Sequence, residues 1–306
     1  MRIAFIHEQN AFLPELSAYT DFFSKRGIDC VTISRNDAKR TQSDVEWYFM
    51  GTAFKRNGCI TIHEYTSSST PPFAPLKNAL KKQFNSKPDF RLFLNHFVDE
   101  QFQFSDNIPS GFRDMGVNLA QFESDQSSIE KKFDFIYVGE LANRKIERVI
   151  DMFVNGILSQ HSLAILSRNY HRLKTKYRSF ANIHFIGPVL PKEVAKYLSQ
   201  SKFGLNLIPN QPPYNQQTST KLLEYAAANL PIISHEYAWV RNFQSEYGGE
   251  FYYVDENLSN LTWERLNAFS YSWPDLTEWT WEHQIRASTV LEFLESKFPT
   301  LKLTSS

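Results

Sequence analysis

Short apolar runs alternate with amphipathic stretches along the first third of the chain. Residues 2–7 (RIAFIH) form a continuous apolar run that predicts a buried strand, and residues 16–25 have the spacing of a helix. Residues 29–33 (DCVTI) predict a second strand, which completes a β-α-β unit. Such alternation favours a parallel sheet with helices on both faces. Further buried strands are expected at residues 45–49, 59–62 and 90–94.

The pattern restarts after residues 123–132 (ESDQSSIEKK), a polar stretch that is the best linker candidate. Two doubly wound halves with a cleft between them follow from this repetition, and we place them at residues 1–125 and 126–275. In the second half, strands are expected at 133–138, 162–166, 183–186, 203–208 and 231–234, and helices at 145–158, 192–199 and 219–228.

Composition and charge exclude several classes of protein. Hydrophobic residues make up 42% of the 306 residues, which excludes a disordered chain. Because 33 basic residues balance 33 acidic ones, no overall field draws the protein to nucleic acid, and no nucleic-acid partner is expected. Cys30 and Cys59 show no metal-ligand spacing, so we expect buried free thiols in a reducing cytoplasm.

The first residues, MRIAFIHE, lack the apolar core of a signal peptide, and no stretch approaches the roughly 18–20 apolar residues that span a bilayer. We therefore expect a cytoplasmic protein. Leu76, Leu80 and Phe84 have helical spacing within a local basic run, which either contacts a membrane peripherally or forms a solvated amphipathic helix. The lysines of this run are Lys77, Lys81, Lys82 and Lys87.

Candidate chemistry lies where strands of the second half end, because open α/β sheets bind ligands at the carboxyl ends of their strands. The segment 139–145 (GELANRK) follows a predicted strand and combines a turn glycine, Gly139, with Arg144 and Lys145 at a helix start. Cations there oppose the helix dipole, and a bound anion would explain them. A solvated surface pair is the alternative.

A second such place is the segment 218–228 (TSTKLLEYAAA), where Thr218, Ser219 and Thr220 can cap a helix and present backbone N–H groups. Lys221 and Glu224 lie three residues apart, hence on one face near the positive end of the helix. They suit a diphosphate and ribose hydroxyls respectively, or else form an i, i+3 salt bridge.

A third place is the segment GPV at residues 187–189, between a predicted strand and a helix. The small Gly187 lets the backbone approach a ligand. An ordinary turn would explain it equally well.

Taken together, these segments resemble the donor domain of GT-B glycosyltransferases, especially the family 4 group of retaining enzymes. YVGELANRK resembles the strand, glycine and basic pair of the family, and TSTKLLEYAAANLPIIS resembles its phosphate and ribose helix. NIHFIGPVLPKEVAKYLSQSKFGLNLIP is similar to its base-binding loop, helix and following strand. The resemblance implies an α/β fold of the GT-B type, two Rossmann-like domains facing a central cleft. TWEHQ resembles the return helix, so residues 276–306 are expected to cross back to the N-terminal domain.

By position, the resemblance assigns residues to the diphosphate of a nucleotide sugar. Lys145, Arg144 and Lys221 would neutralise the leaving diphosphate, with Lys145 and Lys221 as catalytic groups. Ser219 and Thr220 would offer backbone donors. Fixed cations and N–H groups there would stabilise the transition state more than the ground state.

The resemblance also assigns the rest of the donor. Glu224 would hold the ribose, Val189 with Gly187 would contact the base, and Gly139 would form the tight turn. The family commonly has a glutamate eight residues before the ribose glutamate, touching the donor sugar, and here Gln216 occupies that position. An amide hydrogen-bonds hydroxyls but cannot act as a carboxylate, so Gln216 bears on donor identity and activity.

The N-terminal half offers fewer candidates. His63, in CITIHEYTSSS, is expected to end a strand at the cleft edge and resembles a family position near the donor sugar. It is therefore a candidate for catalysis or sugar contact, and the alternative is a structural histidine. Glu64 shares that location. Glu15 opens a helix where the family approaches the donor phosphates, although acids at helix starts are favoured by the dipole in any case.

These observations lead to one expected function and two alternatives. We expect a bacterial glycosyltransferase that uses a nucleotide-diphosphate sugar and extends a surface polysaccharide, a lipopolysaccharide or a lipid-linked oligosaccharide. The resemblance implies retention, and the lack of a DxD pair at a strand end predicts catalysis without a metal or other cofactor. The alternatives are a degenerate GT-B protein that binds nucleotide or glycan without turnover, and a sugar-nucleotide epimerase of the same fold.

Overall fold

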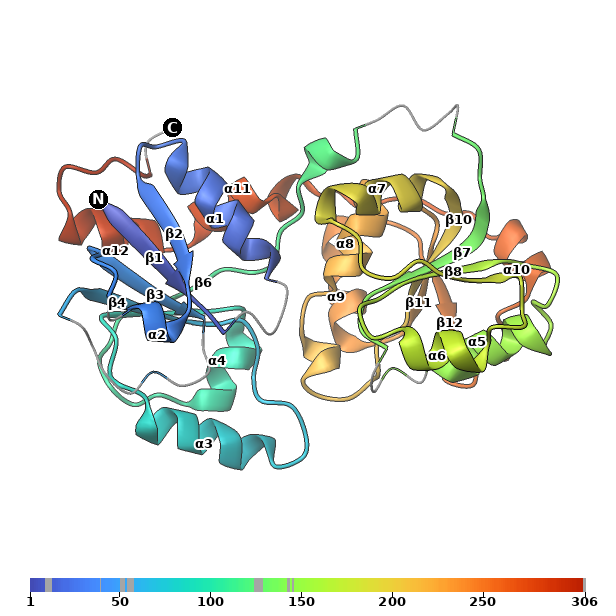
Figure 1. The fold of residues 1–306 in the computed structure, drawn as a ribbon, viewed down its shortest axis with the longest axis horizontal. Helices are drawn as coiled ribbons and strands as arrows, with labels where there is room; N and C mark the ends of the chain where they lie inside the picture. Colours follow the sequence, from blue (N-terminus) through green and yellow to red (C-terminus); the bar gives the residue numbers. More distant parts are fainter. Residues whose placement is uncertain are drawn as a thin grey trace. The chain divides into compact units, whose positions relative to one another are not determined.

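The computed structural model describes residues 1–8, 13–38, 40–49, 53, 58–123, 129–141, 144 and 146–304. The chain divides into two compact units (Figure 1). Unit 1 comprises Met1–Gly116 and Glu278–Ser306, and unit 2 comprises Val117–Thr277. Each unit contains one six-stranded sheet in which all paired strands are parallel, which confirms the predicted α/β class with two Rossmann-like domains.

The sheet of unit 1 has the order β2-β1-β3-β4-β5-β6. Its strands are apolar along most of their length because helices cover both faces, as in β3, where every residue is buried. The strands are β1 (Arg2–Ile6), β2 (Asp29–Ile33), β3 (Val45–Phe49), β4 (Ile60–Tyr65), β5 (Phe90–Phe93) and β6 (Ser110–Phe112).

The end of the chain completes the core of unit 1. Leu291 and Leu294 pack in the same apolar cluster as Phe5 and Trp47 of the first strands. Figure 1 shows the last two helices, in red, beside the blue N-terminal elements. The helices of unit 1 are α1 (Pro14–Ser24), α2 (Arg35–Ala38), α3 (Ala74–Phe84), α4 (His96–Phe102), α11 (Trp281–Ala287) and α12 (Val290–Lys297).

The sheet of unit 2 has the order β12-β11-β10-β7-β8-β9, which is the Rossmann strand order. Its strands are β7 (Phe133–Val138), β8 (Leu163–Leu166), β9 (Ile183–Phe185), β10 (Ser201–Asn206), β11 (Ile232–His235) and β12 (Tyr252–Val254). The helices that cover it are α5 (Ile146–Val154), α6 (His171–Lys176), α7 (Pro191–Ser199), α8 (Thr220–Ala227), α9 (Ala238–Tyr247) and α10 (Trp263–Ala268).

Two smaller features of the structure differ from what the sequence predicted. The short strands β6 and β12, of three residues each, were not predicted from the sequence. Cys30 and Cys59 are free thiols as expected, but they are half-buried rather than buried. Within the described ranges, no helix is long and apolar enough to cross a membrane.

Candidate functional site

The centre of the unit 2 sheet is its topological switch point. Strands β7 and β10 pair there, with Phe135 opposite Phe203. From β7 the sheet continues through β8, and from β10 it continues in the other direction through β11. Ligands of open α/β sheets bind at the carboxyl ends of strands at such a point. Gly139 follows β7 at this edge, and α8 lies between β10 and β11 in the chain.

Gly139 and Lys221 meet at this edge, as the sequence placed them. The φ angle of Gly139 is 129°, which side-chain-bearing residues rarely adopt, and its N–H donates to the carbonyl of Leu166 at 2.9 Å. A Cβ atom at position 139 would lie 3.6 Å from Nζ of Lys221. The ammonium also lies 4.5 Å from the centre of the Tyr137 ring. That distance is an ordinary van der Waals contact, so the backbone angle rather than space for the lysine is what favours glycine at this position.

Lys221 and Glu224 are desolvated charges without a direct ion pair. Burial, and then the charge of Arg144, lower the pKa of Lys221 to about 7, while Glu224 opposes this shift. Burial raises the pKa of Glu224 to about 7, opposed by Lys221. Among the ion pairs of the described residues there is none between these two, so the i, i+3 salt bridge that the spacing allowed is not formed.

Several hydrogen-bond donors at the same edge have no partner within the described part of the chain. The guanidinium of Arg144 lies 4.5 Å from the ring centre of Tyr214, and its Nη1 is buried and unbonded. Nε2 of Gln217 and Oγ of Ser167, which follows β8, are likewise buried without a hydrogen bond. Buried donors without partners are costly, so the arrangement suits an acceptor-rich ligand. Lys145 lies outside the described residues.

A buried polar network holds the start of α8. Ser219 occupies the N-cap position, but its hydroxyl donates to Oδ1 of Asn206 at 2.7 Å and caps no backbone group. Asn206 in turn donates to Ser234 at 3.0 Å and to Tyr237 at 3.1 Å. The sequence missed Asn206, whose only signal is an amide in the apolar segment FGLNLI. Without a side-chain cap, the N–H groups of Thr220 and Lys221 remain available to a ligand, whereas the N–H of Leu222 donates to the carbonyl of Ser219 at 3.0 Å.

Two more predicted positions lie at the start of α8 or just before it. Thr220 is the first residue of α8, and Gln216 ends the short 3₁₀ helix Tyr214–Gln216 that precedes it. Both side chains are half-buried.

An aromatic ring lies close to Gly187, where the sequence predicts that the backbone approaches a ligand. Its φ angle is 86°, and a Cβ atom there would lie 3.0 Å from a ring carbon of Tyr170. Tyr170 belongs to the loop SRNYHR after β8, so an aromatic ring packs against the glycine. Val189, two residues further on, is half-exposed.

The candidates of the N-terminal half lie in the interior of unit 1. His63 is two residues from the end of β4 and is 0% exposed, so it does not end a strand at an open edge. Both carboxylate oxygens of Glu64 are bonded, one to Arg113 and the other to Nε1 of Trp47 at 2.7 Å. Glu15 is 1% exposed, and burial raises its pKa against the opposing charge of Arg113. These positions correct the expectation of accessible cleft residues.

Comparison with protein families assigns most of unit 2. Residues 144–258, which contain α8 and the loops around it, match the family described as glycosyl transferase-like. The match covers less than half of the chain, so it shows a glycosyl transferase-like segment within unit 2. The two Rossmann-like units have the architecture of the GT-B fold.

Solved structures share the fold of this chain at low sequence identity. Sucrose-phosphate synthase from Thermosynechococcus elongatus is 13% identical, with 98% of this chain and 99% of that chain covered and a TM-score of 0.64. Anabaena HepE in complex with UDP-glucose is 8% identical, with 88% and 89% covered and a TM-score of 0.62. A Listeria monocytogenes protein assigned as a UDP-N-acetylglucosamine 2-epimerase is 10% identical, with 99% and 98% covered and a TM-score of 0.54. A search of curated proteins found no match.

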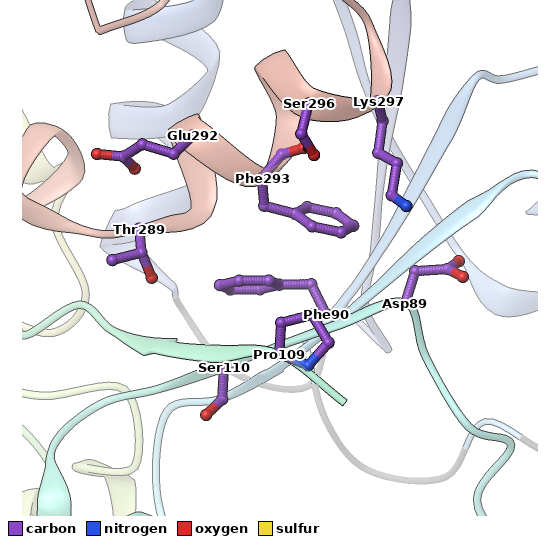
Figure 2. A pocket seen from close by; sticks show the side chains of 9 residues that line it. All are labelled: Asp89, Phe90, Pro109, Ser110, Thr289, Glu292, Phe293, Ser296 and Lys297. Carbon is purple, nitrogen blue, oxygen red and sulfur yellow. The ribbon is translucent and has the colours of Figure 1, made fainter. Parts of the chain in front are cut away.

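The chain also has a pocket of about 590 Å³ in unit 1, between α12 and the strands β5 and β6 (Figure 2). Phe90 and Phe293 face each other in it, with ring centres 4.8 Å apart. Asp89 and Phe90 mark the amino end of β5, opposite the edge where parallel sheets bind ligands. None of the residues that the sequence singled out lines this pocket.

Proposed function

We propose that this chain is a glycosyltransferase that moves a sugar from a nucleoside-diphosphate donor, bound at the carboxyl edge of the unit 2 sheet, to a glycan acceptor. The acceptor we propose is a surface polysaccharide, a lipopolysaccharide or a lipid-linked oligosaccharide. Peripheral membrane contact through the basic run of α3 (Lys77, Lys81, Lys82 and Lys87) belongs to the same proposal. Transfer would retain the anomeric configuration and need no metal ion.

The observation that carries the donor proposal is the group of unpaired cations and donors at the switch point. Burial desolvates Lys221, Arg144 is half-buried near it, and the ion pairs of the described residues include no acidic partner for either. The unbonded donors of Ser167 and Gln217 and the uncapped N–H groups of Thr220 and Lys221 add to them. A diphosphate supplies the negative charge and the acceptor oxygens that these groups lack.

The same arrangement explains how the chemistry would proceed. As the glycosidic bond breaks, negative charge grows on the leaving diphosphate, and Lys221 with Arg144 stabilises it in a site with little water. The anion also raises the pKa of Lys221 from about 7, so the lysine is cationic when the donor is bound. Glu224, one helical turn further, would accept hydrogen bonds from the ribose hydroxyls.

Gln216 motivates the alternative of a protein that binds a nucleotide or glycan without turnover. Its amide precedes α8, where related enzymes place a carboxylate against the donor sugar. Product formation separates this alternative from transfer, and a change of sugar configuration on the nucleotide would instead indicate an epimerase.

The first test is a thermal-shift screen against UDP, GDP, CMP, ADP and dTDP and their common sugars. A ligand that binds only the native state raises the apparent stability, by roughly 2.7 kcal/mol at a concentration 100 times its dissociation constant. We expect one nucleoside diphosphate to raise the melting temperature clearly. If none does so with a folded sample, the donor site as proposed is not functional.

The second test assigns the site by calorimetry with the nucleotide found in the screen. Lys221→Ala and Glu224→Ala should each weaken binding at least tenfold, which corresponds to about 1.4 kcal/mol. Lys132→Ala and Glu264→Ala are matched controls, because both residues are exposed in unit 2 and lie near the amino ends of its strands. Lys132 precedes β7, and Glu264 adjoins Trp263, which packs on Phe203 near the start of β10. Wild-type affinity in both site variants would remove the assignment.

Metal independence has its own test. Among the described residues, no three His, Cys, Asp or Glu side chains gather where they could hold a metal ion. We expect turnover with the identified donor to continue in excess chelator. Loss of turnover that magnesium or manganese restores would contradict this part of the proposal.

A further inference from the structure

Helix α3 turns its apolar stripe away from the core of unit 1. Its only buried residue is Asn78, whose Oδ1 accepts from the N–H of Ser69 at 3.1 Å and whose Nδ2 donates to the carbonyl of Gln101 at 3.3 Å. An amphipathic helix ordinarily buries its apolar face, so a buried amide opposite exposed leucines reverses the usual arrangement. Figure 1 shows α3 at the surface of unit 1, beside α4.

The exposed stripe is large. Phe73, Leu76, Leu80 and Phe84 recur every three or four residues, and they are 73%, 59%, 44% and 57% exposed. They are four of the seven large hydrophobic side chains that are exposed in the described part of the chain. Contiguous exposed apolar side chains of this kind mark interaction sites.

The backbone at the start of the helix holds its aromatic side chain in water. Phe73 occupies the N-cap position with a φ angle of 62°, in the left-handed region that bulky residues avoid. Such conformations persist where the surrounding structure imposes them and are concentrated at functional sites. Phe73 continues the stripe by one turn beyond the helix itself.

The charge beside the stripe defines the partner. Lys77 and Lys81 directly follow Leu76 and Leu80, and α3 contains no acidic residue. Burial and the neighbouring charge of Lys77 lower the pKa of Lys81, as expected where like charges crowd together. Because the chain has a formal net charge of zero, this positive surface is a local feature rather than a consequence of overall composition.

We infer that α3 is a membrane anchor whose apolar stripe, Phe73, Leu76, Leu80 and Phe84, inserts into the interface of a bilayer that contains anionic phospholipids. Basic amphipathic helices lie in the plane of the interface with their apolar face among the acyl chains. Lys77 and Lys81 lie at the headgroups and attract anionic lipid. The inference extends the contact proposed above from the lysines to the stripe, and it does not depend on the nucleotide chemistry of unit 2.

The experiment is co-sedimentation of the full chain with vesicles of phosphatidylcholine alone or mixed with phosphatidylglycerol. We expect binding to the mixed vesicles that weakens at high salt, because screening acts on the lysines. Leu76→Ser combined with Leu80→Ser should lower the partition coefficient at least tenfold. Lys77→Gln and Lys81→Gln should each lower it about fivefold.

The controls distinguish insertion of α3 into the bilayer from nonspecific adsorption to vesicles and from misfolding of the variants. Ile157→Ser removes an apolar side chain of unit 2 that is 62% exposed, and it should leave vesicle binding unchanged. The thermal shift with nucleotide should persist in the double leucine variant, because α3 carries none of the proposed donor-binding residues. Absence of vesicle binding by the wild type, or full binding by the double variant, overturns the inference. So does a wild-type dimer that the double variant dissociates, because a second copy would then cover the stripe.

Discussion

Lys221 and Glu224 would bind a ligand at the cost of stability in the free protein. The pKa of Lys221 falls from 10.5 to about 7 on folding, so the folded state binds fewer protons than the unfolded chain between these values. Stability from this group is therefore lost as the pH falls from 10.5 to 7. The pKa of Glu224 rises from 4.5 to about 7, and its contribution is lost as the pH rises through that window. Near pH 7 both groups oppose folding.

The first prediction follows from these signs. Lys221→Met keeps the length of the side chain and removes the charge, so it should raise the free energy of unfolding of the ligand-free protein by ~1 kcal/mol at pH 7. The same change should weaken nucleoside-diphosphate binding at least tenfold. Urea titration and calorimetry measure the two effects. The control is Lys132→Met, at an exposed position just before β7, which should change neither the free energy of unfolding nor nucleotide binding. If Lys221→Met instead lowers the free energy of unfolding, the lysine is part of a stabilising ion pair.

At the residue scale, the sequence predicted the site residues that belong to a local motif. It missed the residues whose role depends on contacts with distant parts of the chain. Gly139 and Lys221 could be placed at one edge because each follows a strand of the same parallel sheet. Asn206 could not, since its importance comes from contacts with Ser219, Ser234 and Tyr237, which are 13 to 31 residues away in the chain.

At the scale of elements, the position of α8 depends on the end of β10. Asn206 is 0% exposed and bridges the N-cap residue Ser219 to Ser234 on β11 and to Tyr237. The network thereby fixes where the first turn of α8, with its N–H groups, lies relative to the sheet. Buried amides that satisfy several partners specify such local geometry because any alternative leaves polar groups unpaired.

The second prediction tests that positioning role. Asn206→Ala should lower the free energy of unfolding by ~2 kcal/mol, because it leaves buried hydroxyls without their partner. It should also weaken nucleoside-diphosphate binding, since the start of α8 is no longer held. Asn182→Ala is the matched control: its amide donates to the carbonyls of Phe153 and His161 at 2.8 and 2.9 Å, away from the switch point. The control should lose stability and keep affinity; equal affinity loss in both variants would contradict positioning by Asn206.

The elements themselves were predictable where a strand is buried on both faces, as in β3 and β7, because such strands read as continuous apolar runs. The edge strand β6 (SGF) was not, since it contains no such run, whereas the short run FYYV at residues 251–254 was a signal for β12. The spacing of α3 predicted a helix but not which side faces the core. Its orientation depends on the bonds of Asn78 to Ser69 and Gln101, which no periodicity reveals.

At the scale of the molecule, the two units differ in how the chain builds them. Unit 2 is one continuous segment, whereas unit 1 combines both ends of the chain. Ile285, Leu291 and Leu294 from the last two helices are each 0–1% exposed in the core of unit 1. Unit 1 is therefore complete only when residues 278–306 are present, while unit 2 has its own core and carries the proposed donor site.

The third prediction is that residues 117–277 fold alone and bind the nucleotide identified in the screen, with an affinity within about tenfold of the full chain. Residues 1–116 alone should lack a cooperative thermal transition, because the apolar surface that α11 and α12 cover would face water. Joining residues 278–306 to residue 116 through a flexible Gly/Ser linker should restore that transition. Circular dichroism and calorimetry on the three proteins measure these outcomes. A cooperative transition in residues 1–116 would show that the C-terminal helices are accessory to unit 1, and a folded but non-binding unit 2 would place essential donor contacts in unit 1.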